Sequence, residues 1–244
     1  PEVIVPGGTL DRKAGILSLE AGKTRYTANR GLEQLRCEIA AYMSGKYDMT
    51  YDPATEVLVT VGGSEAIDMS LRALLCPGDE VIIPQPSYVC YEPLVRMIGG
   101  TPVILETTAE NDFKVTPGQL LPLISPRTNA LLLPYPCNPT GAIMEREDLE
   151  ALADVLRGTN ILVISDEIYS ELTFGGKSHV SIGAIDGMKE RCVIVNGLSK
   201  TYSMTGWRMG YACGPAPVMK QITKIHQYAI MCAPTTAQYA AIEA

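Results

Sequence analysis

The stretch Asn196-Gly-Leu-Ser-Lys-Thr-Tyr-Ser-Met-Thr-Gly-Trp-Arg-Met-Gly210 follows an apolar run that ends at Val195. It places Lys200 among small residues just past an expected strand, with Arg208 eight positions further on. A lysine that forms a Schiff base needs such surroundings, because small neighbours let a planar cofactor approach the backbone and a strand end fixes the amine. A nearby arginine can hold a phosphate. Taken alone, a lysine after a strand is more often a solvated surface charge.

The composition is that of a globular protein with a sizeable core, in one large α/β domain or two small ones. The chain has 244 residues, of which 46% are hydrophobic and 19% charged. Its net charge of −7 gives no electrostatic basis for binding nucleic acid or anionic lipid. Two histidines exclude a histidine-rich metal site and disfavour a Ser-His-Asp triad. Seven scattered cysteines without a CxxC pair, and no apolar run of roughly 20 residues, lead us to expect a soluble, cytoplasmic protein.

Continuous apolar runs alternate with amphipathic segments over most of the chain. Runs such as Val81-Ile-Ile and Ile161-Leu-Val-Ile are typical of strands covered on both faces. Seven strands are expected, over 57–61, 81–84, 102–105, 130–134, 161–165, 192–196 and 210–214. Helices are expected over 64–75, 87–98, 117–124, 145–156, 217–230 and 235–244, with cap signals at Ser64 and Thr116. Repeated β–α alternation predicts an α/β fold, with a mostly parallel seven-stranded sheet and helices on both faces.

Several polar groups fall at the expected carboxyl ends of strands, where open α/β sheets bind ligands. The run Gly62-Gly63-Ser64 opens a helix, and its free amides could cradle a phosphate or form an ordinary β–α turn. Asp166 could pair with a protonated ring nitrogen or cap a helix. Tyr169 could present its phenol to the same ring or pack in the core.

Two further candidates follow other strands. Asn138, within Pro136-Cys-Asn-Pro-Thr-Gly141, is placed to offer an amide donor to a phenolate oxygen or a substrate carboxylate. A generic Asn-Pro turn would have the same sequence. Tyr88, after Pro86-Ser87, could stack on a planar ring or serve only in packing.

Together these motifs resemble the class I/II aminotransferases, the fold-type I family that depends on pyridoxal 5′-phosphate. The segment 197–210 fits the family's lysine signature throughout, and Asn138-Pro-Thr-Gly141 and Asp166-Glu-Ile-Tyr169 occur in the family's order. The resemblance runs from about Ala14 to the end of the chain. It implies the transfer of an amino group between an L-amino acid and a 2-oxo acid.

The resemblance also implies a role for each site residue. Lys200 would form the Schiff base and move a proton between the substrate Cα and the cofactor C4′. Asp166 would keep the pyridine nitrogen protonated, Asn138 and Tyr169 would bond the ring's 3-oxygen, and Tyr88 would stack on the ring. The catalytic residues would then be Lys200, Asp166 and Tyr169. The phosphate would be bound by Gly63, Ser64, Arg208 and, from the neighbouring subunit of a homodimer, Tyr26.

Without the resemblance, Tyr26 has the pattern of an aromatic residue in a surface loop.

The sequence also departs from the family in three places. Residues from Val3 to Leu10 replace a Gly-Glu-Pro-Asp segment that lines the substrate pocket, and Gly197 stands where many relatives carry a phosphate-binding serine. We also expect the family's C-terminal small domain to be missing, and with it the arginine that clamps the substrate α-carboxylate.

We therefore expect an irregular segment over 1–13, a cofactor-binding large domain over 14–244 and a truncated aminotransferase. Two alternatives stay open at this point. One is a lyase of similar fold that uses the same cofactor for β-elimination or decarboxylation. The other is a catalytically idle fragment that only binds the cofactor.

Overall fold

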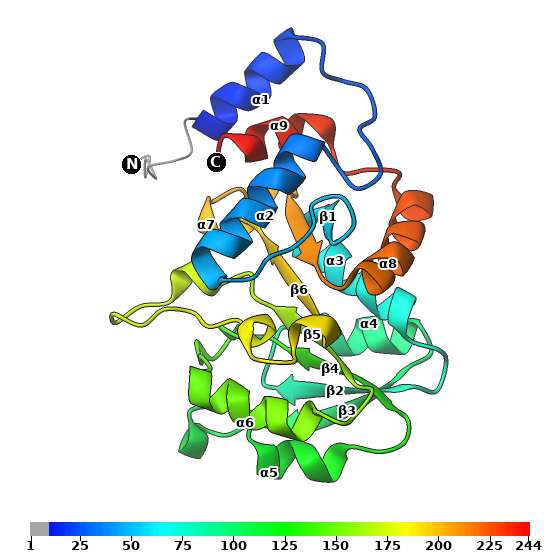
Figure 1. Cartoon of the computed structure of the whole chain (residues 1–244), viewed down its shortest axis with the longest axis vertical. Coiled ribbons are helices and arrows are strands. Elements are labelled where there is room, and N and C mark those ends of the chain that lie inside the picture. Colours follow the sequence, from blue (N-terminus) through cyan, green and yellow to red (C-terminus); the bar gives the residue numbers. More distant parts are fainter. Residues whose placement is uncertain (1–9) are drawn as a thin grey trace.

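The computed structural model describes residues 10–244, which form a seven-stranded sheet with helices on both faces (Figure 1). The strands lie in the order β1-β7-β6-β5-β4-β2-β3. All neighbouring pairs from β3 to β6 are parallel, whereas β7 is antiparallel to both of its neighbours. The mostly parallel sheet expected from the sequence is confirmed. The strands are Val57–Thr60 (β1), Glu80–Gln85 (β2), Thr101–Glu106 (β3), Thr128–Leu133 (β4), Leu162–Asp166 (β5), Cys192–Gly197 (β6) and Gly210–Cys213 (β7).

All six expected helices are present, some of them shorter than expected, and α1, α2 and the short α7 are additional to them. The helices are Leu10–Glu20 (α1), Glu33–Tyr47 (α2), Gly62–Leu74 (α3), Tyr91–Met97 (α4), Pro117–Leu120 (α5), Arg146–Leu156 (α6), Leu198–Thr201 (α7), Ala216–Ala229 (α8) and Thr235–Ile242 (α9). The cap signal at Thr116 is confirmed, because its side chain forms a capping box with Gln119 at the start of α5. None of the helices within residues 10–244 is long and apolar enough to cross a membrane.

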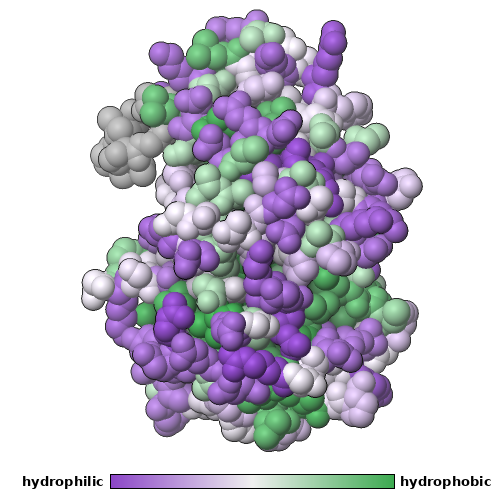
Figure 2. All heavy atoms as spheres, viewed as in Figure 1, coloured by the Kyte–Doolittle hydropathy of each residue, from purple (hydrophilic) through white to green (hydrophobic). Residues whose placement is uncertain are grey.

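Alternate residues of the central strands enter two separate cores. In β6, Val193 and Val195 belong to the core beneath α3, α4 and α8, while Cys192 and Ile194 belong to the core beneath α2 and α6. Every residue of β6 is buried, as expected of a strand covered on both faces. Helices α2 and α6 cross the face that Figures 1 and 2 turn to the reader, and that face is largely hydrophilic.

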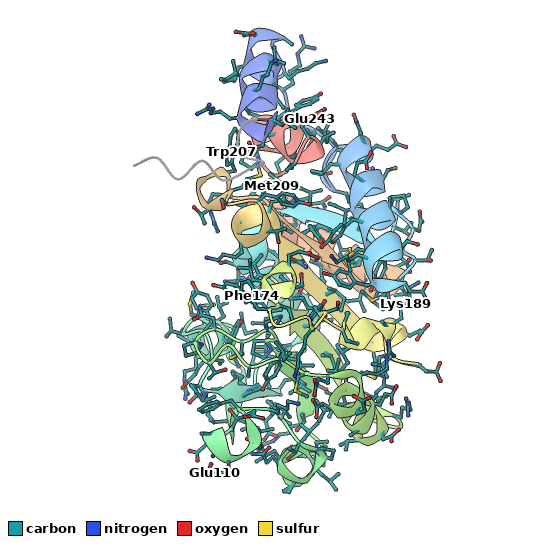
Figure 3. All side chains as sticks on the ribbon, turned by 90° about the vertical axis from the view of Figure 1, so that its left-hand side faces the viewer. Glu110, Phe174, Lys189, Trp207, Met209 and Glu243 are labelled. Carbon is teal, nitrogen blue, oxygen red and sulfur yellow. The ribbon has the colours of Figure 1, made fainter. Side chains whose placement is uncertain are left out.

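Helix α1 packs against α9 with its small residues inward. Gly15 lies so close to Trp207 that an added Cβ would come within 2.5 Å of the indole. Figure 3 shows Trp207 beside the lower end of α1. The irregular segment expected over 1–13 is therefore wrong for residues 10–13, which are helical because α1 has this packing partner. Residues 1–9, which include most of the departure that begins at Val3, lie outside the described residues.

Candidate active site

A cavity of about 250 Å³ opens at the carboxyl edge of the parallel strands. Strands β4, β5 and β6 are neighbours in the sheet, so the segments that follow them meet at this edge. The residues that line the cavity are Gly63, Ser64, Ile67, Tyr88, Tyr91, Pro134, Pro136, Asn138, Asp166, Ile168, Tyr169, Ser199, Lys200, Thr205 and Arg208. Eight of the nine predicted site residues are in this set.

The N-terminus of α3 forms one wall of the cavity. The cap signal predicted at Ser64 is wrong, because the helix already begins at Gly62. The N-cap residue is Val61, which makes no side-chain capping bond; its own N–H donates to the Glu65 carboxylate at 2.5 Å. Ser64 is consequently exposed in the first turn, on the cavity wall. The first amides of a helix lack partners within it and, with the helix dipole, attract anions.

Two glycines allow this helix end to lie directly against β6 and β7. A Cβ added to Gly210 would lie 2.5 Å from the backbone carbon of Gly62 and 2.7 Å from the backbone nitrogen of Gly63. A Cβ added to Gly197 would lie 2.9 Å from the Cα of Gly210, so a serine at position 197 would push the two strands apart. Close backbone approach thus explains why glycine occupies both positions.

Arg208 adds a cation beside these amides. Its backbone is left-handed, with a φ of 53°, which is uncommon for a residue that has a side chain. The guanidinium lies over Gly62, where an added Cβ would be 2.6 Å from Nη2. Nη1 donates a hydrogen bond to the Thr205 carbonyl at 3.2 Å. No carboxylate among residues 10–244 forms an ion pair with Arg208, so its other donors can bind an anion.

Asp166 ends β5 and is 7% exposed. Its Oδ2 accepts the Tyr91 hydroxyl at 2.8 Å, and its Oδ1 accepts the Ile168 N–H at 3.2 Å. Burial raises the pKa of the Asp166 carboxyl, and these two hydrogen bonds oppose that rise. Among residues 10–244, no lysine, arginine or histidine forms an ion pair with it. A buried carboxylate without a cation favours a cationic group on a ligand.

The lysine and the phenol predicted for the site lie close together. Lys200 is in α7, directly after β6, and its Nζ lies 5.5 Å from the centre of the Tyr169 ring. Tyr169 follows β5, and Asn138 follows β4. Tyr88 follows β2 and is 42% exposed. All four side chains line the same cavity.

One predicted residue lies elsewhere, and seven lining residues, three of them polar with a hydroxyl group, were not among those predicted. Tyr26 does not line the cavity of its own chain and is 80% exposed. The residues not predicted for the site include Tyr91, Ser199 and Thr205. Each of them is adjacent to a predicted residue or about one helical turn from it, so proximity in the sequence was the available signal.

A buried polar network fixes the segment that carries Asp166. The next residue, Glu167, is fully buried. Its carboxylate accepts hydroxyl hydrogen bonds from Ser165 at 2.9 Å and Ser181 at 2.7 Å, and it pairs with His179 Nε2 at 2.9 Å. These contacts anchor the backbone immediately after Asp166, and so hold the acid in place.

Comparisons with known proteins agree with this arrangement. The sequence model of the family "Aminotransferase class I and II" matches residues 11–244, and the chain belongs to this family. The chain is 43% identical over 245 residues to the aspartate aminotransferase of Geobacillus stearothermophilus, covering 100% of this chain and 62% of that protein. The crystal structure of an aromatic aminotransferase from Pyrococcus horikoshii OT3 superposes with a TM-score of 0.94 at 38% identity, covering 99% of this chain and 64% of that one.

A third protein supports the same conclusion. The structure of N-succinyldiaminopimelate aminotransferase from Mycobacterium tuberculosis has a TM-score of 0.94 at 34% identity, covering 98% of this chain and 62% of that one. The resemblance stated from the motifs is therefore confirmed, as is the fold-type I class. The chain spans about 60% of the length of the curated relatives that it matches.

Proposed function

We propose that this chain binds pyridoxal 5′-phosphate and transfers an amino group between an L-amino acid and a 2-oxo acid. The observation that carries the proposal is the convergence of Lys200, Asp166 and Arg208 on one cavity beside the N-terminus of α3. A reactive amine, a buried acid and an anion site are the three features that an aldehyde cofactor with a basic ring and a phosphate requires.

The described residues fit such a group. Gly63 and Ser64, in the first turn of α3, line the cavity together with Arg208, which suits a phosphate. The buried Asp166 carboxylate has two hydrogen-bond donors but no ion-pair partner among residues 10–244, which suits a protonated ring nitrogen. Tyr169 and Asn138, from neighbouring strand ends, would bond the ring's 3-oxygen, and Tyr88 would stack on the ring.

When bound, pyridoxal phosphate supplies an aldehyde that accepts amino groups and a ring that withdraws electrons from the bond being broken. The chain supplies position and proton transfer. Lys200 Nζ would bind the aldehyde carbon with loss of water, and the nitrogen of the amino acid would replace it there. The freed Lys200 amine would then take the proton from the Cα of the amino acid. Asp166 would hold a proton on the ring nitrogen, and the phosphate contacts would fix the ring's orientation.

Spectroscopy of the purified protein with pyridoxal phosphate tests this proposal. An L-amino acid should convert the bound aldehyde form to the amine form, and a 2-oxo acid should restore the aldehyde. If ammonia or carbon dioxide is released and the aldehyde remains, the activity is that of a lyase. If the cofactor binds and no amino acid changes its spectrum, the chain only holds the cofactor.

We also propose that two copies of the chain form the working unit. The support is an apolar surface on α1 and the loop after it, where Leu10, Ile16, Leu17, Leu19 and Tyr26 are each at least half exposed. A second copy would cover this surface, and Tyr26 would reach the phosphate in the partner's cavity. The cytoplasmic location expected from the cysteine pattern stays a prediction, and all seven cysteines are free.

A mixing experiment tests the shared site. A Lys200→Ala chain and a Tyr26→Ala chain are each expected to be poorly active alone. Mixed dimers would contain one site with both side chains intact, so unfolding and refolding the two chains together should restore about a quarter of the wild-type activity. No recovery in mixed dimers would show that Tyr26 acts within its own chain or not at all.

A further inference from the structure

Tyr91 contacts the acid of the site and has no role in the function proposed above. It is the first residue of α4 and is only 3% exposed. Its hydroxyl donates to Oδ2 of Asp166 at 2.8 Å, while Oδ1 of the same carboxylate accepts the Ile168 N–H at 3.2 Å. Both oxygens of the acid are thus held by neutral donors, one from α4 and one from its own loop.

The surroundings of the Tyr91 hydroxyl keep it protonated, so that it remains a hydrogen-bond donor. Burial, together with the neighbouring Asp166 charge, raises the pKa of the Tyr91 phenol far above its ordinary value. The phenol therefore keeps its proton over the whole range in which an enzyme works. Hydrogen bonds to a carboxylate favour its ionised form, and they are stronger than bonds between neutral groups.

Tyr91 has a second contact within the site. Its ring meets the ring of Tyr88 edge to face, with the ring centres 5.8 Å apart and the planes at 82°. Tyr88 lies on the cavity wall, where we place it against the cofactor ring. One buried side chain therefore touches both the residue that would face the ring nitrogen and the residue that would stack on the ring.

We propose that Tyr91 is a positioning residue, whose hydroxyl holds Asp166 ionised and oriented toward the ring nitrogen while its ring edge holds Tyr88 in place. This inference rests on the proposed function. The proposal predicts where one proton lies, on the Asp166 carboxyl or on the ring nitrogen. With the Tyr91 hydroxyl present, the proton resides on the nitrogen. Without this hydroxyl the proton moves toward the carboxylate, because a neutral acid beside a neutral nitrogen then has a lower free energy in a buried site than an ion pair.

The substitution Tyr91→Phe isolates the hydroxyl, because it removes one oxygen and keeps the ring contact with Tyr88. The protein is loaded with pyridoxal phosphate labelled with ¹⁵N in the ring, and the ¹⁵N chemical shift reports whether the nitrogen is protonated. We expect a protonated nitrogen in the wild type and a clear move toward the unprotonated shift in Tyr91→Phe. Turnover should fall about tenfold, since a hydrogen bond to a charged group is lost.

Two controls separate this role from general damage. Tyr51→Phe removes another buried phenol hydroxyl, whose only hydrogen-bond partner among residues 10–244 is the Met49 sulfur, and should leave the ¹⁵N shift at the wild-type value. In an Asp166→Asn background, Tyr91→Phe should produce no further change in the ¹⁵N shift, because the hydroxyl acts through the acid.

The outcomes are distinct. A wild-type protein that shows no bound cofactor signal contradicts the proposed function itself. A wild-type protein with a protonated nitrogen, together with a Tyr91→Phe variant that has the same shift, overturns the role of Tyr91 and leaves the proposed function intact. A ¹⁵N change in Tyr91→Phe that persists in the Asp166→Asn background would also overturn it, because the hydroxyl would then act by another route.

Discussion

The contact between β7 and the start of α3 makes Gly210 a sensitive position. A methyl group there would stand 2.5 Å from the Gly62 backbone carbon, whereas ordinary contacts begin at 3.4 Å. Both partners are backbone, so no side chain can turn aside and the two elements must separate. We expect Gly210→Ala to cost about 1–3 kcal/mol of stability, as overpacking does. A shift of about 1 Å in the phosphate end of the site would lower kcat/KM about 100-fold.

Gly206→Ala is a matched control in the same segment, because no atom of the described part of the chain lies within 4 Å of a Cβ at that position. Thermal unfolding of the cofactor-free proteins measures the stability difference. The fluorescence of Trp207, the only tryptophan of the chain, can follow pyridoxal phosphate binding. If Gly210→Ala equals Gly206→Ala in both melting temperature and cofactor affinity, the close packing does not form the phosphate end of the site.

Three further substitutions test separate parts of the account. Burial raises the pKa of the Asp166 carboxyl in the folded protein above its value in the unfolded chain, so ionisation of Asp166 destabilises the fold as the pH rises through the folded pKa. Asp166→Asn should therefore stabilise the cofactor-free protein by about 1 kcal/mol near neutral pH. Thermal melts at pH 3, where the carboxyl is protonated, should show no such gain. Arg208→Gln should weaken pyridoxal phosphate binding about tenfold or more in fluorescence titrations; an equal affinity would remove the arginine from the phosphate site. Glu167→Ala should lower the free energy of unfolding in urea by about 3 kcal/mol, because it leaves three buried side chains without their hydrogen-bond partner. Glu150 is exposed, so Glu150→Ala should lower it by less than about 0.5 kcal/mol. Equal losses for the two glutamates would contradict the anchoring role.

The strands could be predicted because their apolar runs are continuous. Runs such as Leu131-Leu-Leu are buried on both faces of the sheet, so the sequence there is apolar at every position and not at alternate positions. Helix α2 was not predicted, although Leu35, Ile39 and Met43 recur at every fourth position on its buried face. The residues between them are charged or small, so the buried and exposed faces of the helix differ little in hydrophobicity.

Much of the site could be located from its motifs, and the unpredicted parts depend on contacts between distant segments. The start of α3 was misplaced because the N-cap residue is Val61 and not Ser64. The Val61 N–H donates to Glu65, whose carboxylate also lies 2.8 Å from His226 Nδ1. The bond between Tyr91 and Asp166 joins residues 75 positions apart, so no local pattern marks it. Local sequence indicates which groups are available, whereas their partners are decided by packing.

The most direct test of the central claim is to map where the chain holds its cofactor. The protein is incubated with pyridoxal phosphate, reduced with borohydride to fix the lysine-bound aldehyde, digested and examined by mass spectrometry. We predict that the label is on Lys200, and that a Lys200→Ala variant is not labelled at a comparable level. Label spread over surface lysines such as Lys46 and Lys189, unchanged in Lys200→Ala, would contradict the account.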